Sequence, residues 1–359
     1  MNPQKKSILI AASGTGGHIF PALAVAKELQ EFDIHWLGVP GRLEEQLVVK
    51  DYPLTKVSVE GLIRPSQWLG AGSKLVRSTF QVRSLLQNLQ AKAVFSTGGY
   101  IAGPSILAAR SLGLPVLLHE SNALPGKVTR FLAPLVDCLA LGFDEAREHL
   151  KGKGTWVGTP FREDCLAPSP LVNLSEDTEI PAEAPVIVVL GGSQGARGLN
   201  QVIVDSLPDW IARGIYIIHL TGQGEYDRVV ATAPKSPYYK PLPFWNQMGP
   251  LYYRADLVIS RAGAGTITEL MATGRPSILV PYPFAAEDHQ TFNAQTLVSR
   301  GAALMFQERQ IERTQFTRLV LELFDSPQTL SAMGQKAHAL AKPRAAQDTA
   351  ELLRNLVNP

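Results

Sequence analysis

Four glycine-rich segments carry the residues best suited to chemistry, and each directly follows a short apolar run. The first is Gly14-Thr15-Gly16-Gly17-His18, and the others span residues 98–104, 191–197 and 262–266. Glycine lets a backbone turn sharply and approach a ligand closely. Free amides at the start of a following helix bind phosphate or pyrophosphate. The pattern therefore indicates anion binding, and a tight strand-to-helix turn without a ligand is the alternative.

His18 ends the first segment and is the candidate general base. Imidazole titrates near neutral pH, so it can accept a proton from an attacking hydroxyl. The alternative is a structural histidine at the start of a helix. We expect that helix to begin near Phe20-Pro21, because proline is favoured at the first helical position.

The third and fourth segments favour a nucleotide ligand. Ser193 and Gln194 add side-chain hydrogen bonds to a turn whose amides can hold a diphosphate, either of a sugar nucleotide or of NAD. Amides at 264–266 are placed to meet phosphate or uracil edges. Glu269 falls about one turn into the next expected helix, where a carboxylate can accept hydrogen bonds from both hydroxyls of a ribose. Alternatively, Glu269 only complements the helix dipole.

A polar cluster suited to a sugar follows the last of these segments. Glu287-Asp288-His289-Gln290 comes after an expected strand at 277–280 and the proline-bounded Pro281-Tyr282-Pro283. Polar side chains that gather past the end of a strand are well placed to bind sugar hydroxyls.

The elements that must position these residues are short buried strands alternating with amphipathic helices. Continuous apolar runs are typical of strands covered on both faces, as in a parallel sheet. We expect strands at 7–12, 34–38, 93–97, 116–119, 186–190, 216–220, 257–260 and 277–280. The alternation predicts an α/β fold of two Rossmann-like doubly wound domains that face each other across a cleft.

A proline-rich stretch divides the chain. Residues 160–185 contain five prolines and an acidic cluster, a composition typical of a linker. We therefore expect an N-terminal domain over 1–160 and a C-terminal domain over 161–339. The C-terminal segment, about 340–359, is expected to form an apolar-faced helix that must pack on a domain.

Charge is distributed unevenly along the 359 residues, whose net charge is +2. Residues 1–160 carry 17 basic and 12 acidic side chains, and residues 161–359 carry 17 and 20. No carboxylate lies between Glu60 and Glu120, so this part attracts anions such as phosphates or an anionic bilayer. Two cysteines, Cys138 and Cys165, imply no disulfide framework.

The region 61–83 mixes large apolar side chains with Arg64, Lys74 and Arg77. That mixture suits an interfacial surface on anionic lipid. An ordinary amphipathic helix with its apolar face in the core is the alternative. The uncharged runs 7–26 and 93–109 are interrupted by glycine and proline, so neither is expected to span a membrane.

Taken together and in order, these segments resemble glycosyltransferase family 28. The markers are Gly14–His18 with Pro21-Ala22-Leu23-Ala24, Ser96-Thr97-Gly98-Gly99-Tyr100, His119-Glu120-Ser121-Asn122, and the stretches 191–200 and 261–269 with Gln290. The resemblance implies the two-domain GT-B fold, a donor sugar nucleotide on the C-terminal domain, and neither cofactor nor metal. It also implies that the C-terminal tail returns to the N-terminal domain, which would carry the acceptor and face the membrane.

The resemblance assigns roles residue by residue. His18 matches the proposed base, and Tyr100 and Glu120 match polar positions on the acceptor side. The donor contacts carry over to Thr15, Gly16, Gly17, Asn122, Arg162, Ser193, Trp245, Ala264, Gly265, Thr266, Ile267, Thr268, Glu269 and Gln290. Three positions depart from the family pattern: Ser13 stands where glycine is frequent, Ser121 where glutamine is usual, and Trp245 where a smaller apolar residue is found.

The implied activity is inverting transfer of N-acetylglucosamine from UDP-N-acetylglucosamine. The acceptor would be the C4 hydroxyl of undecaprenyl-pyrophosphoryl-N-acetylmuramyl-pentapeptide, a step of peptidoglycan synthesis that serves cell shape and division. A peripheral protein on the cytoplasmic face of the bacterial inner membrane is expected, with no nucleic-acid partner. The alternatives are a GT-B enzyme with another acceptor, a UDP-N-acetylglucosamine 2-epimerase, a nicotinamide-dependent oxidoreductase, and a scaffold that binds the nucleotide sugar without turnover.

Overall fold

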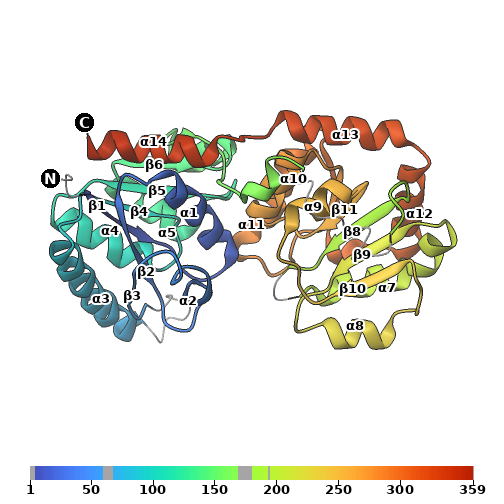
Figure 1. Ribbon diagram of the computed structural model, residues 1–359, viewed down its shortest axis with the longest axis horizontal. Coiled ribbons are helices and arrows are strands. Elements are labelled where there is room, and N and C mark those ends of the chain that lie inside the picture. Colours follow the sequence, from blue (N-terminus) through green and yellow to red (C-terminus); the bar gives the residue numbers. More distant parts are fainter. Residues whose placement is uncertain (1–4, 60–67, 169–179, 193–194, 359) are drawn as a thin grey trace. The chain divides into compact units, whose positions relative to one another are not determined.

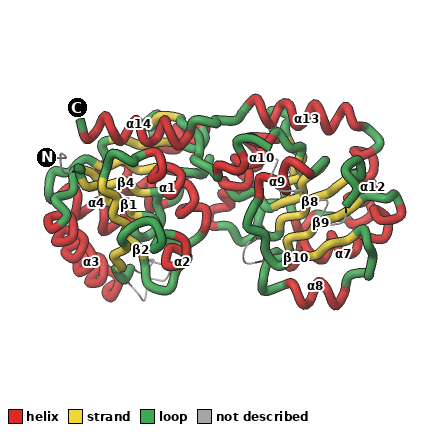
Figure 2. Tube along the Cα trace, viewed as in Figure 1, coloured by secondary structure: helices red, strands yellow, loops and turns green. Residues whose placement is uncertain are grey.

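The computed structural model describes residues 5–59, 68–168, 180–192 and 195–358. The chain forms two compact units, each with its own parallel sheet (Figure 1). Unit 1 comprises Met1–Phe161 and Lys342–Pro359, and unit 2 comprises Arg162–Ala341. In both units the strands are flanked by helices (Figure 2).

Unit 1 contains a seven-stranded sheet in which all neighbouring strands are parallel. Its order is β3-β2-β1-β4-β5-β6-β7, the strand order of a doubly wound fold. The strands are β1 (Ser7–Ala11), β2 (Asp33–Gly38), β3 (Leu54–Lys56), β4 (Ala93–Ser96), β5 (Val116–Glu120), β6 (Cys138–Leu141) and β7 (Thr155–Trp156).

Helices cover both faces of this sheet. They are α1 (Gly16–Glu28), α2 (Glu44–Leu47), α3 (Trp68–Asn88), α4 (Ala102–Ser111), α5 (Lys127–Leu132) and α14 (Ala345–Val357). Side chains of β1 alternate between two cores: Leu9 shares one with α3 and α4, and Ile8 shares the other with α1 and α14. The C-terminal helix therefore completes the core of unit 1, where it packs on α1, β4 and β5 (Figure 1).

The first helix begins earlier than predicted. Helix α1 starts at Gly16, and Pro21 lies inside it. Thr15 is extended, and its carbonyl accepts the amides of His18 and Ile19 at 3.1 and 3.3 Å. These two bonds close the first turn before the proline is reached. Gly16, Gly17 and His18 consequently form the N-terminal turn of the helix, in which the amides of Gly16 and Gly17 have no partner within the helix.

Unit 2 contains a six-stranded parallel sheet of order β10-β9-β8-β11-β12-β13. The strands are β8 (Val186–Leu190), β9 (Tyr216–Leu220), β10 (Tyr239–Leu242), β11 (Leu257–Ser260), β12 (Ser277–Leu279) and β13 (Ala303–Met305). The helices are α7 (Arg197–Ala212), α8 (Tyr226–Thr232), α9 (Met248–Arg254), α10 (Ala264–Thr273), α11 (His289–Val298), α12 (Arg313–Phe324) and α13 (Pro327–Ala339).

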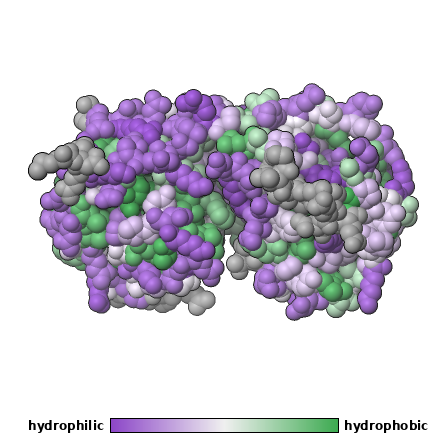
Figure 3. Space-filling model, viewed as in Figure 1, coloured by the Kyte–Doolittle hydropathy of each residue, from purple (hydrophilic) through white to green (hydrophobic). Residues whose placement is uncertain are grey.

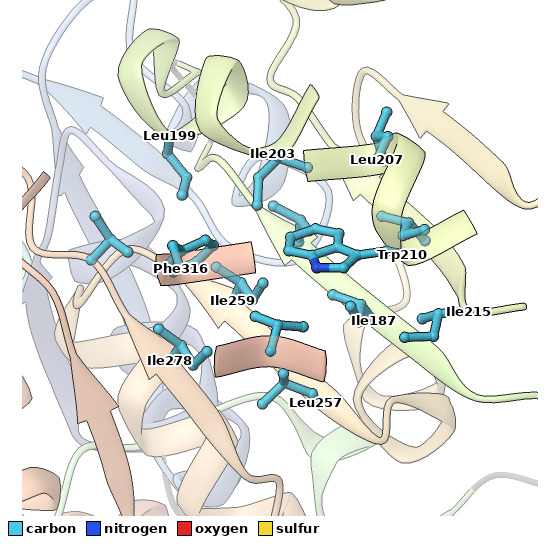
Figure 4. Packing of buried hydrophobic residues seen from close by; sticks show 14 of the residues in the cluster. Ile187, Leu199, Ile203, Leu207, Trp210, Ile215, Leu257, Ile259, Ile278 and Phe316 are labelled. Atoms are coloured by element: carbon cyan, nitrogen blue, oxygen red, sulfur yellow. The ribbon is translucent and has the colours of Figure 1, made fainter. Parts of the chain in front are cut away.

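One core of unit 2 is built around Trp210 of α7 (Figure 4). Its ring lies 6.3 Å from that of Phe316 of α12, measured between centroids. Ile187 of β8 and Ile259 of β11 face the same cluster. This packing fixes α7 against the sheet, and with it the turn that precedes the helix.

Candidate functional site

His18 is held by the end of strand β4. Its Nδ1 lies 2.7 Å from the carbonyl oxygen of Thr97, and the Thr97 hydroxyl donates to the carbonyl of His18 at 3.0 Å. Because a carbonyl can only accept, Nδ1 must carry the proton in this hydrogen bond. The neutral ring therefore has its lone pair on Nε2, the arrangement required of a general base.

The turn after β4 passes close to this free nitrogen. Gly98 and Gly99 have φ angles of +89° and +72°, a region that L side chains rarely adopt. A β-carbon at Gly99 would lie 3.5 Å from Nε2 of His18. The two glycines thus let the backbone run beside the imidazole without covering it. Tyr100, the next residue, is 52% exposed at the same end of the sheet.

A buried carboxylate fixes the first glycine turn. Glu44, at the start of α2, is fully buried and accepts hydrogen bonds from the amides of Val39 (2.8 Å) and Gly14 (3.3 Å). The Ser13 hydroxyl donates to the same carboxylate. Ser13, which departs from the family pattern, therefore adds an anchor to the turn. Glu44 could not be recognised from the sequence, because nothing in its local pattern marks it as buried.

Glu120 anchors the loop that follows β5. Its Oε1 accepts from the backbone and side-chain nitrogens of Asn122, both at 3.0 Å. Its Oε2 accepts from the Gly126 amide at 3.1 Å and from the Thr129 hydroxyl at 2.5 Å. With four donors on one buried carboxylate, the side chain acts on its own loop and sets the position of Asn122.

The neighbouring His119 is neutral and structural. It is fully buried, and burial lowers its pKa below the ordinary value of 6.5. Its Nε2 lies 3.0 Å from the Gly158 carbonyl, so Nδ1 is left to accept the Ser121 hydroxyl at 3.3 Å. Ser121, which stands where glutamine is usual in the family pattern, is thus hydrogen-bonded to His119 inside unit 1.

In unit 2, the fourth glycine segment becomes the start of α10. Gly263 is extended and precedes the helix, so residues 264–266 form its first turn. This geometry leaves the amides of Ala264, Gly265 and Thr266 available to an anion. Ile267 and Thr268 are buried, and the Thr268 hydroxyl donates to the Ala264 carbonyl at 2.9 Å. The structure therefore assigns the side chains of Ile267 and Thr268 to the interior.

Glu269 contacts one other predicted donor residue, Arg162. Its Oε1 lies 3.2 Å from Nε of Arg162, and Arg162 also donates to the Asn246 carbonyl at 3.4 Å, next to Trp245. Its Oε2 accepts the Tyr252 hydroxyl at 2.8 Å. Burial raises the pKa of Glu269 above its ordinary value of 4.5, although the Arg162 guanidinium opposes this shift. Tyr252 is a partner that the sequence analysis did not identify.

Gln290, at the start of α11, presents a donor. Its Oε1 accepts the amides of Tyr282 (2.9 Å) and Ala262 (3.2 Å). Both bonds use the oxygen, so the two hydrogens on Nε2 have no partner among the described residues. The side chain thus ties the turns after β11 and β12 together and keeps an amide group free to donate to a ligand.

One predicted donor residue and part of the predicted membrane region lie outside the residues that the structure describes. Ser193 lies outside the described residues, as do residues 61–67 of the predicted membrane region. Within the described ranges, no group of three or more His, Cys, Asp or Glu side chains is arranged to hold a metal ion. None of the helices in those ranges is long and apolar enough to cross a membrane.

Comparison with known proteins identifies relatives over nearly the whole chain. The N-terminal domain of glycosyltransferase family 28 matches residues 8–141, and its C-terminal domain matches residues 186–349. A Gloeobacter violaceus protein named UDP-N-acetylglucosamine–N-acetylmuramyl-(pentapeptide) pyrophosphoryl-undecaprenol N-acetylglucosamine transferase is 53% identical over 98% of this chain and 99% of its own. A Nostoc punctiforme protein of the same name is 49% identical over 98% of both.

A solved structure shares the fold over a similar extent. The crystal structure of Acinetobacter baumannii MurG aligns with a TM-score of 0.79 at 32% identity, covering 98% of this chain and 99% of that one. The prediction of two Rossmann-like α/β domains of the GT-B type is confirmed by this likeness and by the two parallel sheets.

Proposed function

The chain belongs to glycosyltransferase family 28, and from this membership we propose that it transfers N-acetylglucosamine from UDP-N-acetylglucosamine to undecaprenyl-pyrophosphoryl-N-acetylmuramyl-pentapeptide. The observation that carries the proposal is its 53% identity, over nearly full length, with a relative named for this reaction. The product is the lipid-linked disaccharide used in peptidoglycan synthesis, on which cell shape and division depend.

The reaction is a single displacement at the anomeric carbon. The C4 hydroxyl of the muramyl sugar attacks C1 of N-acetylglucosamine, and the bond from C1 to the diphosphate oxygen breaks. His18 takes the hydroxyl proton on Nε2, the nitrogen left free by the bond to Thr97. Attack opposite the leaving group inverts C1 and forms a β-1,4 linkage. Tyr100 lies on the acceptor side, where Glu120 contributes by holding the loop of Asn122.

The donor is held by groups that neutralise the leaving UDP. Amides at the start of α10 and its helix dipole stabilise negative charge on the diphosphate. Glu269 accepts from the ribose hydroxyls, and the Nε2 group of Gln290 donates to a sugar hydroxyl. The remaining donor contacts are assigned to Thr15, Gly16, Gly17, Asn122, Arg162, Ser193 and Trp245.

Gln290→Glu tests the sugar contact. Glutamate keeps an oxygen for the amides of Ala262 and Tyr282 but loses the free N–H donor. We expect the KM for UDP-N-acetylglucosamine to rise roughly ten-fold, because a lost hydrogen bond to the sugar costs on the order of 1 kcal/mol or more. The affinity for UDP, which lacks the sugar, is expected to stay unchanged. Gln295→Glu, on an exposed position of the same helix, is the control, and equal effects of both variants would contradict the assignment.

We further infer that unit 1 binds an anionic membrane surface through α3. The helix has a core face with Val82 and Leu86, and an outer face where Val76 and Phe80 are 56% and 67% exposed. Basic Lys74 and Arg77 lie on the same exposed stretch. Apolar residues exposed among polar ones are visible on unit 1 in Figure 3. A lipid-linked acceptor supports this peripheral location, which we assign to the cytoplasmic face of the inner membrane.

Vesicle flotation measures this membrane contact. Replacing both Val76 and Phe80 with serine is expected to reduce binding to vesicles that contain phosphatidylglycerol by roughly ten-fold, because each loses apolar area buried in the interface. High salt is expected to weaken binding of the unmodified protein, since the basic residues are screened. Phe284→Ser removes a 71% exposed aromatic side chain from unit 2. If this control lost as much binding as the α3 variant, α3 would not be the contact.

Release of UDP distinguishes the proposed function from its alternatives. Purified protein is incubated with UDP-N-acetylglucosamine and EDTA, with and without the lipid-linked muramyl-pentapeptide. The proposal expects release only with acceptor, and undiminished by EDTA. Release without acceptor would indicate an epimerase or hydrolase. Donor binding without release would indicate another acceptor or a scaffold.

A further inference from the structure

A chain of buried polar side chains lies behind the glycine turn that follows β8. The Tyr239 hydroxyl is 2.9 Å from Nδ1 of His219, and Nε2 of His219 is 3.0 Å from Oδ1 of Asn200. Nδ2 of Asn200 donates to the Thr221 carbonyl at 3.0 Å. His219 and Asn200 are fully buried, and Tyr239 is 8% exposed. The mechanism above uses none of these side chains.

Each bond in this chain fixes the direction of the next. The Thr221 carbonyl can only accept, so Asn200 turns its Nδ2 toward it and its oxygen toward His219. Nε2 of His219 must then carry a proton, and Nδ1 is left to accept the Tyr239 hydroxyl. Burial lowers the pKa of His219 to about 3, so the ring is neutral at physiological pH. A single tautomer satisfies all three hydrogen bonds.

Asn200 lies between two backbone turns, one after β8 and one after β9. It lies in the first turn of α7, directly after the glycine segment 191–197. A β-carbon at Gly191 would lie 3.1 Å from Oδ1 of Asn200 and 3.0 Å from the Leu220 carbonyl. The turn after β9 lies close to the turn after β8, because a β-carbon at Gly222 would lie 2.4 Å from the Gly195 amide nitrogen. The two turns are in backbone contact, since the Gly191 amide donates to the Leu220 carbonyl at 2.8 Å, and the Asn200 side chain bonds the second turn at Thr221.

We propose that His219 and Tyr239 are positioning residues for the diphosphate of the nucleotide sugar. They act through Asn200, whose orientation holds the turn that starts at Gly191 against the turn at Thr221. The proposal rests on the proposed function, because a bound sugar nucleotide brings a diphosphate, and on the prediction from the sequence that the turn at 191–197 contributes to holding it. Neither side chain touches the ligand.

Three variants separate the hydrogen bond from simple packing. His219→Gln keeps an N–H group that reaches the position of Nε2, whereas His219→Leu keeps volume and loses the donor. Tyr239→Phe removes only the hydroxyl that selects the tautomer. We expect His219→Leu to raise the Kd for UDP, measured by calorimetry, roughly ten-fold, because a buried acceptor is left unpaired and its side chain reorients. His219→Gln is expected to bind UDP within about two-fold of the unmodified protein.

The ring nitrogens of His219 provide a second readout. ¹⁵N NMR of the unmodified protein is expected to show a neutral ring protonated on Nε2. A ring protonated on Nδ1 would overturn the proposal, as would a His219→Leu variant that binds UDP normally. Should His219→Leu fail to fold, Tyr239→Phe decides: the proposal requires weaker UDP binding, and unchanged binding overturns it. An unmodified protein that does not bind UDP would overturn the proposed function, and this inference with it.

Discussion

His18→Ala is expected to lower kcat by about 10²- to 10⁴-fold, the usual contribution of a positioned general base. The reason lies in the bond to Thr97, which directs the protonated nitrogen into the protein and leaves Nε2 as the acceptor. Alanine removes that acceptor, and the muramyl hydroxyl must then attack without losing its proton to the enzyme. Since His18 belongs to unit 1 and the nucleotide contacts proposed for α10 belong to unit 2, the Kd for UDP is expected to change little.

Steady-state UDP release at saturating donor and acceptor measures this effect, and calorimetry with UDP checks the affinity. His149→Ala, which alters an exposed histidine of the same unit, is expected to retain full activity. Near-normal turnover of His18→Ala with unchanged UDP affinity would show that another group takes the proton.

Most inner strands could be predicted from the sequence, whereas the inner strand β6 and the edge strands β3, β7, β10 and β13 were not among those expected. Strands such as β8 and β11 are continuous apolar runs because helices cover both faces of the sheet. Strand β3 is Leu-Thr-Lys and strand β10 contains Pro241. At a sheet edge one side of the strand makes no ladder, so short polar strands and proline are tolerated there. Such segments carry no pattern that separates them from loops.

The glycine turns could also be predicted, because glycine has a local conformational signature. The groups that hold those turns lie far away in sequence. Glu44 reaches Gly14 across 30 residues, and Tyr239 reaches His219 across 20. Which polar side chain becomes buried beside a turn depends on how helices and strands pack, and no local pattern of residues encodes that. The predicted start of α1 failed for a related reason, since the Thr15 carbonyl closes the first helical turn before Pro21.

The same arrangement, a buried polar side chain hydrogen-bonded to a turn or loop, recurs in three places. The turn at Gly14 is held by Glu44, the loop of Asn122 by Glu120, and the turn at Thr221 by Asn200. In each case a buried polar side chain orients backbone next to residues that the proposed function assigns to ligand binding. Glycine lets the backbone approach a ligand closely, and the buried group supplies the fixed geometry that a preorganised anion site requires.

Glu269→Gln is expected to weaken UDP binding at pH 7.5 by roughly ten- to a hundred-fold. Hydrogen bonds to a charged acceptor are worth about 1.5–3 kcal/mol, more than those to a neutral amide. The variant keeps the shape of the side chain and an oxygen for Tyr252, so the change reports the loss of charge toward ribose and Arg162. Glu322→Gln, at an exposed pair with Arg318 on α12, is expected to bind UDP normally.

The pH dependence of UDP binding tests the charge of Glu269 directly. Burial raises the pKa of this carboxyl above 4.5. The ionised carboxylate accepts stronger hydrogen bonds from the two ribose hydroxyls than the protonated acid does, so UDP affinity is expected to fall as pH drops through this raised pKa. The same shift has the opposite sign for folding. The native state holds the proton more tightly than the unfolded chain, so the contribution of Glu269 to stability falls as pH rises between the two pKa values.

UDP itself also titrates, but equally in experiments with the unmodified protein and with Glu269→Gln. Calorimetry at pH 7.5 and 5 is therefore expected to show a larger loss of affinity for the unmodified protein than for Glu269→Gln, and equal losses would mean that Glu269 does not bind the nucleotide as an anion.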